Sequence, residues 1–187
     1  MIVRRLVHGS LAPNEAEQLL ATARNASFNY DHVGSTLDPA AWPDRQVEAK
    51  SKRLGSGRDM FDIATARLRA WAPQRRLGAL VLPQRAEVEP GATVLVVLRL
   101  GLLAIVVPDR VVDVIVEPDR YGWAYGSLPG HAEAGEEGFM VAIDGDGAVT
   151  ATITLDAVPT GVAALGAPLT RAFQHLAVRR YLEALVP

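Results

Sequence analysis

The chain has 187 residues, 49% of them hydrophobic and 21% charged, which is the composition of a single globular domain over residues 1–187. It has no cysteine, so disulfides, thiolate metal sites and a cysteine nucleophile are excluded, and a cytoplasmic location is expected. The net charge is −2 with both signs interspersed, which predicts no nucleic-acid partner.

The first part of the chain predicts one helix and one strand. Apolar residues recur at helical spacing over 13–25, and glutamates in the first turn favour a helix start there. Aromatic and β-branched residues over 28–36 then predict a strand. Residues 37–53 contain proline, aspartate and lysine without a clear period, so we expect a surface connection.

A second helix is predicted after the short glycine-rich segment 55–57. Ser56 is a suitable N-cap residue, and the apolar residues from Phe61 to Trp71 repeat at intervals of three and four. Pro73 is expected to end this helix. The segment lacks the Lys-Ser/Thr ending of a P-loop, so capping is its expected role rather than phosphate binding.

From residue 77 to 156 the apolar period changes to two, which predicts strands. The candidate strands lie near 78–82, 93–99, 102–107, 111–116, 121–127, 137–143 and 149–155. The most apolar stretch, 93–107, is interrupted by Arg99 and Gly101 and is too short for a membrane span. In the last candidate strand apolar residues alternate with threonines, which is typical of an antiparallel sheet covered on one face.

The segment 167–185 predicts one long helix with Pro168 in its first turn. Its apolar positions form a stripe wide enough to lie across the sheet: Leu169, Phe173, Leu176, Ala177, Tyr181 and Ala184. The predicted fold class is therefore α+β, with a curved antiparallel sheet of about six or seven strands gripped by a long C-terminal helix.

The strand predicted at 121–127 has two unequal faces. Aromatic side chains occupy one face and small residues the other: Tyr121, Trp123 and Tyr125 against Gly122, Ala124 and Gly126. The small-residue face leaves space that a ligand or a closely packed helix could fill.

A loop between Gly130 and Gly138 is expected to bring one imidazole and up to three carboxylates together: His131, Glu133, Glu136 and Glu137. This group could act as an acid–base pair, bind a divalent cation, or hold a glycine-rich turn through backbone N–H groups. There is no His-Glu-x-x-His spacing and no second histidine nearby, so we expect no metal and no cofactor. The candidate catalytic residues are His131, Glu133 and Glu136.

Three stretches carry a distinctive pattern: Tyr-Gly-Ser-Leu-Pro-Gly-His-Ala-Glu-Ala-Gly-Glu-Glu at 125–137, Gly-Ala-Pro-Leu-Thr-Arg-Ala-Phe-Gln at 166–174 and Arg-Arg-Tyr-Leu-Glu-Ala-Leu at 179–185. Together they resemble the family called domain of unknown function 1990, or uncharacterised protein family 0548. This resemblance implies a helix-grip fold similar to that of the START and Bet v 1-like superfamily. Members of that superfamily commonly hold apolar ligands between the sheet and the C-terminal helix.

The leading functional hypothesis is a module that binds a small, largely apolar ligand between the small-residue face of the sheet and the C-terminal helix. The residues expected to contact this ligand are Tyr125, Gly126, His131, Arg171, Phe173, Gln174 and Tyr181. The alternatives are an enzyme that uses the candidate catalytic residues and a structural or partner-binding domain. Arg171 and Gln174 lie three residues apart and could pair with Glu136 or Glu137. The sequence predicts no oligomeric state.

Overall fold

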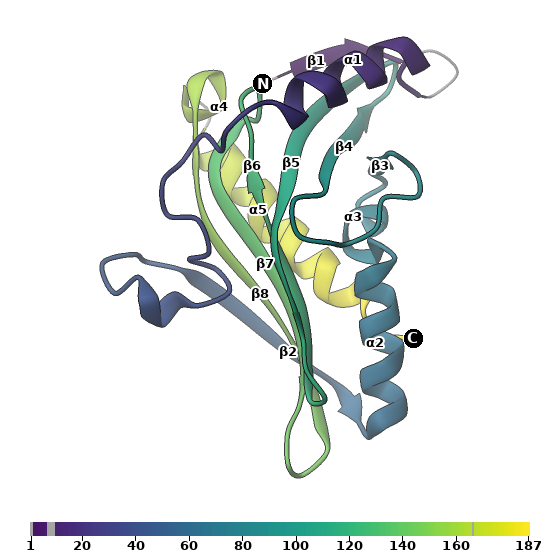
Figure 1. The fold of residues 1–187 in the computed structure, drawn as a ribbon, viewed down its shortest axis with the longest axis vertical. Coiled ribbons are helices and arrows are strands. Elements are labelled where there is room, and N and C mark those ends of the chain that lie inside the picture. The colour runs from purple at the N-terminus through teal and green to yellow at the C-terminus, as the bar shows by residue number, and fades with distance from the viewer. Residues whose placement is uncertain (1, 7–9, 166) are drawn as a thin grey trace.

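The computed structural model describes residues 2–6, 10–165 and 167–187, and its main feature is a long curved sheet (Figure 1). The strands are β1 (Ile2–Arg5), β2 (Glu48–Ser56), β3 (Leu80–Leu82), β4 (Thr93–Leu100), β5 (Leu103–Val116), β6 (Arg120–Ser127), β7 (Glu133–Ile143) and β8 (Ala148–Pro159). The helices are α1 (Pro13–Arg24), α2 (Arg58–Arg69), α3 (Ala72–Arg76), α4 (Gly161–Leu165) and α5 (Ala167–Ala184), with a 3-10 turn at Pro39–Ala41.

The strands follow the order β2-β8-β7-β6-β5-β4-β3, and β1 pairs with β5. Every pairing is antiparallel. Helix α5 runs across the face of the sheet that α2 and α3 also cover (Figure 1). We call this the inner face and the opposite one the outer face. An antiparallel sheet held by a long C-terminal helix confirms the predicted fold class.

The core lies between the inner face and these three helices. The rings of Trp123 on β6 and Phe139 on β7 stack with centroids 4.4 Å apart. Trp71, which precedes α3, lies 4.7 Å from Trp123, and Tyr181 of α5 lies 5.4 Å from Phe139. Because aromatic pairs at these distances add to the free energy of apolar burial, these contacts fix the helices against the sheet.

The predictions for two segments near the N-terminus are wrong. Residues 28–36 were expected to form a strand but form a loop of turns, because their polar groups bond to side chains of the sheet. Strand β2 lies partly in the predicted surface connection. The residues from Glu48 to Arg53 are all exposed, so no alternation of apolar residues marks this edge strand in the sequence.

The end of the second helix also differs from the prediction. The chain turns at Trp71, whose φ of 57° is left-handed, so α2 ends at Arg69 and Pro73 lies in the first turn of α3. At the other end Ser56 is the last residue of β2, and Gly57 precedes α2 without a side-chain cap.

Two boundaries within the sheet are also revised. The predicted strands 102–107 and 111–116 are one strand, β5, with a register shift between residues 111 and 113. Strand β7 begins at Glu133 rather than near residue 137.

In the described part of the chain, every helix falls short of the length and apolarity that crossing a membrane requires.

Candidate functional site

Strand geometry separates the carboxylates that the sequence analysis grouped in one loop. Residues 133–138 belong to β7, and successive side chains of a strand point to opposite faces. Glu133 and Glu137 face inward, where they bond to Gln174 of α5 and to Tyr125. Glu136 faces outward, where it bonds to the loop before β2. Glu133 and Glu136, the two alternative acid–base partners proposed for His131, therefore lie on opposite faces of the sheet.

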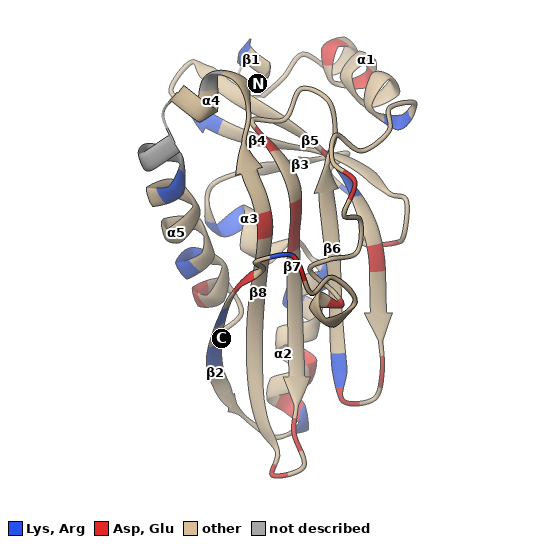
Figure 2. Cartoon of the chain, turned by 90° about the vertical axis from the view of Figure 1, so that its left-hand side faces the viewer, with Lys and Arg blue, Asp and Glu red and all other residues tan. Residues whose placement is uncertain are grey.

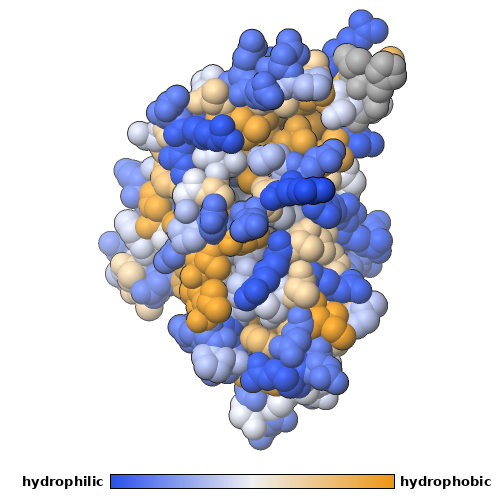
Figure 3. Space-filling model, turned by 45° about the vertical axis from the view of Figure 1, so that its right-hand side comes forward, coloured by the Kyte–Doolittle hydropathy of each residue, from blue (hydrophilic) through white to orange (hydrophobic). Residues whose placement is uncertain are grey.

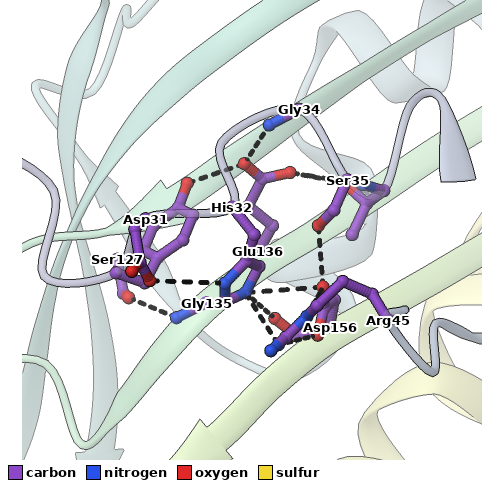
Figure 4. Close-up of polar contacts among 11 residues, drawn as sticks. Asp31, His32, Gly34, Ser35, Arg45, Ser127, Gly135, Glu136 and Asp156 are labelled. Carbon is purple, nitrogen blue, oxygen red and sulfur yellow. Dashed lines mark hydrogen bonds and ion pairs between the residues drawn. The ribbon is translucent and has the colours of Figure 1, made fainter. Parts of the chain in front are cut away.

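Glu136 is 1% exposed and accepts four hydrogen bonds from the loop at residues 30–36 (Figure 4). Its donors are the Tyr30 hydroxyl at 2.8 Å, the Gly34 N–H at 2.5 Å, the Thr36 N–H at 3.3 Å and the Thr36 hydroxyl at 3.0 Å. With these four donors, the hydrogen-bonding capacity of the buried carboxylate is satisfied. The Glu136 carboxylate therefore fastens the loop to the outer face.

Asp156 on β8 extends this arrangement (Figure 4). It accepts hydrogen bonds from the Ser35 hydroxyl at 2.8 Å and from Arg45 Nε at 3.0 Å, and His32 Nε2 lies 3.4 Å from the same carboxyl. Burial alone would raise the pKa of Asp156, but the hydrogen bonds from Arg45 and Ser35 hold that pKa below its ordinary value. We call Glu136, Asp156 and their loop partners the outer anchor.

The small residues of β6 and β7 make room for the outer anchor, which corrects the expectation that they face α5. A Cβ on Gly126 would collide with the Tyr30 hydroxyl, and one on Gly138 would lie 3.0 Å from the Thr36 hydroxyl. Tyr125, next to Gly126, points inward among the core aromatics. The aromatic face of β6, and not its small-residue face, therefore meets the C-terminal helix.

A second polar group lies on the inner face, and we call it the inner cluster: Gln74 of α3, Asp109 of β5, Tyr125 of β6, Glu137 of β7 and Tyr181 of α5. The Tyr125 hydroxyl donates to Glu137 Oε2 at 2.5 Å and lies 3.5 Å from Gln74 Nε2. Burial and the neighbouring Glu137 carboxyl raise the pKa values of both tyrosines. The side chains around Tyr125 thus come from two helices, α3 and α5, and two strands, β5 and β7.

The carboxyls of the inner cluster favour their neutral forms. Burial raises the pKa of Glu137 to about 8, although the Tyr125 hydrogen bond opposes the shift. Burial, with the nearby charges of Glu137 and Glu133, raises the pKa of Asp109 well above its ordinary value. A neutral carboxyl can both donate and accept a hydrogen bond, so the cluster offers a donor and an acceptor to a bound group.

His131 adjoins this cluster in one tautomer. Its Nδ1 accepts a hydrogen bond from the Glu133 backbone N–H at 2.8 Å, so the hydrogen of the neutral ring resides on Nε2. Nε2 lies 3.5 Å from Asp109 Oδ1. Burial lowers the pKa of His131 to about 4. The structure therefore places His131 beside Asp109, and its link to Glu133 is through the backbone and not the carboxylate.

The remaining residues predicted to contact a ligand lie on α5. Gln174 Nε2 donates a hydrogen bond to Glu133 Oε1 at 2.9 Å. Gln174 therefore does pair with the sheet, as expected, but its partner is Glu133 and not Glu136 or Glu137. Arg171 and Phe173 are exposed, whereas Tyr181 is buried in the core. Gln174 and Arg171 also line a narrow cavity of about 20 Å³ between α5 and β8, which is enough for about one water molecule.

Sequence reasoning missed two members of the inner cluster. Asp109 is a charged residue within a run of valines, and a charge inside an apolar strand is a signal that marks a buried site. Gln74 carries no such signal, because only the left-handed turn at Trp71 points it at Tyr125. Among the described residues, no group of three histidine, aspartate or glutamate side chains is arranged to hold a metal ion.

The curved antiparallel sheet, the long C-terminal helix on its inner face and the polar cluster between them define a helix-grip protein. The chain belongs to the family described as "Domain of unknown function (DUF1990)", which matches residues 29–184. This match confirms the family resemblance seen in the sequence.

Two relatives and two solved structures are similar to this chain. UPF0548 proteins of Deinococcus radiodurans and Arabidopsis thaliana are 31% and 27% identical, each over 93% of both chains. The crystal structure of a hypothetical protein from Helicobacter pylori has a TM-score of 0.52 at 10% identity, covering 86% of this chain and 94% of that one, so it shares the fold. The structure of Ara h 8.0201 has a TM-score of 0.45 at 15% identity, covering 75% and 95%.

Proposed function

We propose that this protein binds a small ligand between the inner face of the sheet and α5, and that the ligand has a largely apolar body with a hydrogen-bonding group. The observation that carries the proposal is a set of buried polar atoms without hydrogen-bond partners: Gln74 Oε1, Asp109 Oδ1 and Trp123 Nε1. Each buried polar atom that stays unpaired costs about 1–3 kcal/mol. A ligand with a donor for Gln74 or Asp109 and an acceptor for Trp123 offsets that cost.

The apolar part of the ligand is matched by the aromatic residues around these atoms. Trp71, Trp123, Tyr125, Phe139 and Tyr181 are all buried on this face, with neighbouring ring centroids 4.4 to 6.3 Å apart. Flat apolar molecules stack on such rings, and the polar atoms at their margin then fix the orientation.

Entry of a ligand requires the first half of α5 to move away from the sheet. The cavity of about 20 Å³ beneath it is far smaller than the roughly 300–1,000 Å³ of typical ligand pockets. Between residues 171 and 176 only Gln174 is partly buried, whereas the fully buried residues of the helix begin at Ala177. Opening therefore breaks the hydrogen bond between Gln174 and Glu133.

N-phenyl-1-naphthylamine, an uncharged aromatic amine with one N–H donor, tests this proposal. We expect saturable binding with energy transfer from Trp71 and Trp123, weakened about tenfold in Gln74→Leu and Asp109→Leu because each loses a buried acceptor. Gln174→Ala should speed uptake without weakening binding. Tyr30→Phe is the matched control, since it alters only the outer anchor.

Native mass spectrometry of the purified protein provides a second test. We expect a co-purifying molecule that organic extraction removes. If the protein carries no such molecule and also fails to bind the naphthylamine, the proposal is wrong. If wild type, Gln74→Leu and Asp109→Leu bind the amine equally, the ligand does not contact the inner cluster and the proposal is contradicted as well.

A further inference from the structure

Edge strand β2 and helix α5 form the two sides of an open groove. Its lining includes Lys50 and Lys52 on β2 and His175 and Arg179 on α5, with Leu182 between them. The smaller cavity described above continues the same groove towards Arg171. Five basic residues therefore surround one groove, and Figure 2 shows the Lys and Arg positions of β2 and α5 on the same side of the molecule.

The basic residues of α5 form a single row along the helix. Arg171, His175 and Arg179 are spaced four residues apart, which places them on one face of the helix. Two carboxylates also line the groove, Glu48 at one end and Glu183 at the other. Glu183 is engaged by Arg179 at 3.2 Å. The groove as a whole therefore carries an excess of positive charge.

Lys50 and His175 are held together although both are basic. Lys50 Nζ lies 2.7 Å from His175 Nδ1, which ties β2 to α5 across the groove. A lysine ammonium accepts no hydrogen bond, so the Lys50 ammonium is the donor and His175 Nδ1 the acceptor in this contact. A carboxylate placed in the groove would offer the ammonium a charged and therefore stronger acceptor.

Strand β2 also offers unpaired backbone groups. Among the strands that the structure describes, β2 is the last of the sheet and pairs with β8 alone. Its residues Glu48 to Arg53 are all exposed, so the N–H and C=O groups of its free edge are open to an added strand. The β2 segment 48–52, four of whose residues line the groove, spans about 14 Å, and the helical stretch 171–183 spans about 18 Å. The groove is therefore long enough for a short extended chain.

We propose that this groove binds an extended acidic peptide segment of a partner protein, which adds as a strand to the free edge of β2. Alternate side chains of the added strand then face α5, where acidic groups meet Lys50, Lys52, His175 and Arg179. This site is separate from the inner cluster and does not depend on the ligand proposed above. The proposal gives the partner-binding alternative of the sequence analysis a defined surface.

A second copy of this chain does not fit as the partner. Pairing two β2 edges would bring Lys50, Lys52 and Arg53 of one copy against the same residues of the other. Like charges directly opposite each other destabilise a strand pair, and lysines on edge strands commonly prevent such pairing. An acidic strand reverses the sign of this interaction.

The probe for the test is a fluorescein-labelled octapeptide of alternating glutamate and threonine, measured by fluorescence anisotropy. We expect saturable binding that weakens between 50 and 300 mM NaCl, because the charged pairs are exposed. Lys52→Glu combined with Arg179→Glu should weaken binding at least fivefold. Arg85→Glu combined with Arg99→Glu is the control, with the same change in net charge at exposed positions elsewhere, and should change it less than twofold.

Two further probes separate strand addition from simple charge attraction. The same peptide with all of its backbone amides N-methylated cannot complete the backbone ladder and should bind at least tenfold more weakly. Hydrogen exchange should slow in β2 amides when the unmodified peptide is bound. Equal binding of the methylated peptide, no binding of either peptide, or binding only to phosphatidylglycerol vesicles would each overturn the proposal.

Discussion

Glu136 and Glu137 are adjacent in the chain but belong to two different polar sites on opposite faces of the sheet. Glu136 accepts four hydrogen bonds from the loop at residues 30–36, whereas Glu137 accepts one from Tyr125 beneath α5. The alternation of side chains along β7 is the cause. Substitutions at these neighbours should therefore have different effects, which the following predictions state.

Glu136→Gln should destabilise the fold by about 2–4 kcal/mol. The glutamine amide replaces one acceptor oxygen with an NH₂ group, which cannot accept the hydrogen bonds that Gly34 N–H and the Thr36 hydroxyl donate to the carboxylate. Urea unfolding measures the loss, and hydrogen exchange should show faster exchange at Gly34 and Thr36. Glu17→Gln, at an exposed position of α1, should change stability by less than about 0.5 kcal/mol. Unchanged exchange in the loop would contradict the anchoring role of Glu136.

Gly126→Ala should cost roughly 1–3 kcal/mol, because the new methyl group collides with the Tyr30 hydroxyl that bonds to Glu136. A double-mutant cycle with Tyr30→Ala tests this cause. The double variant should be less destabilised than the sum of the two single changes. Gly145→Ala, where a Cβ would meet open space, is the control. Additive effects would show that Tyr30 is not the residue that the methyl group strikes.

Glu137 should make the protein less stable as the pH rises. Its pKa is about 8 in the folded chain against an ordinary 4.5, so between these values the folded state keeps a proton that the unfolded state has released. We expect the free energy of unfolding to fall by roughly 2 kcal/mol from pH 6.5 to pH 8. Asp109 and Glu133, whose pKa values are also raised by burial, act in the same direction.

The matched variant is Glu137→Gln, which keeps a neutral group beside Tyr125 and does not titrate. Urea unfolding from pH 5 to pH 8 should show a clearly smaller slope for this variant than for the wild type. If the two slopes are equal, Glu137 does not hold a proton in the folded state.

His131 should have the opposite dependence at lower pH. Its pKa is lowered to about 4, so between pH 6.5 and 4 the unfolded chain gains a proton that the folded chain excludes. Stability should therefore fall as the pH drops through this window. His131→Asn keeps an acceptor for the Glu133 N–H, as asparagine does in turns, and removes the titration. The variant should lose less stability on acidification than the wild type.

The control for this prediction is Gln18→Asn, which introduces the same residue type at an exposed, non-titrating position of α1. It should follow the wild type from pH 6.5 to pH 4. Together the two titrations predict a stability maximum near pH 6, which a set of unfolding curves would locate. If His131→Asn and the wild type lose the same stability between pH 6.5 and pH 4, His131 is not the cause of that loss.

The exposed apolar residues bear on the partner-binding alternative. Leu100, Leu102 and Leu103 are 57%, 75% and 49% exposed around the turn between β4 and β5. On the face shown in Figure 3 the apolar surface is divided into several patches separated by hydrophilic residues. Scattered apolar groups of this kind are common on protein surfaces and do not by themselves define a partner.

The sequence by itself determined the elements whose pattern reflects burial on one side. The alternation of Val149, Ala151 and Ile153 with threonines predicts β8, and the spacing of Phe61, Ala64 and Leu68 predicts α2, because in each case one face meets the core. The family motif at 125–137 added the expectation of a helix-grip fold, which the structure confirms.

Only the tertiary structure decided which polar groups meet. Strand β2 has no buried face and the loop at 30–36 is held by Glu136 from more than 100 residues away, so neither leaves a local pattern. The start of β7 at Glu133 assigns each carboxylate to a face, and a shift of one residue would exchange those faces. Local periodicity records what each segment buries, whereas hydrogen-bond partners distant in the chain are set by the packing of the whole fold.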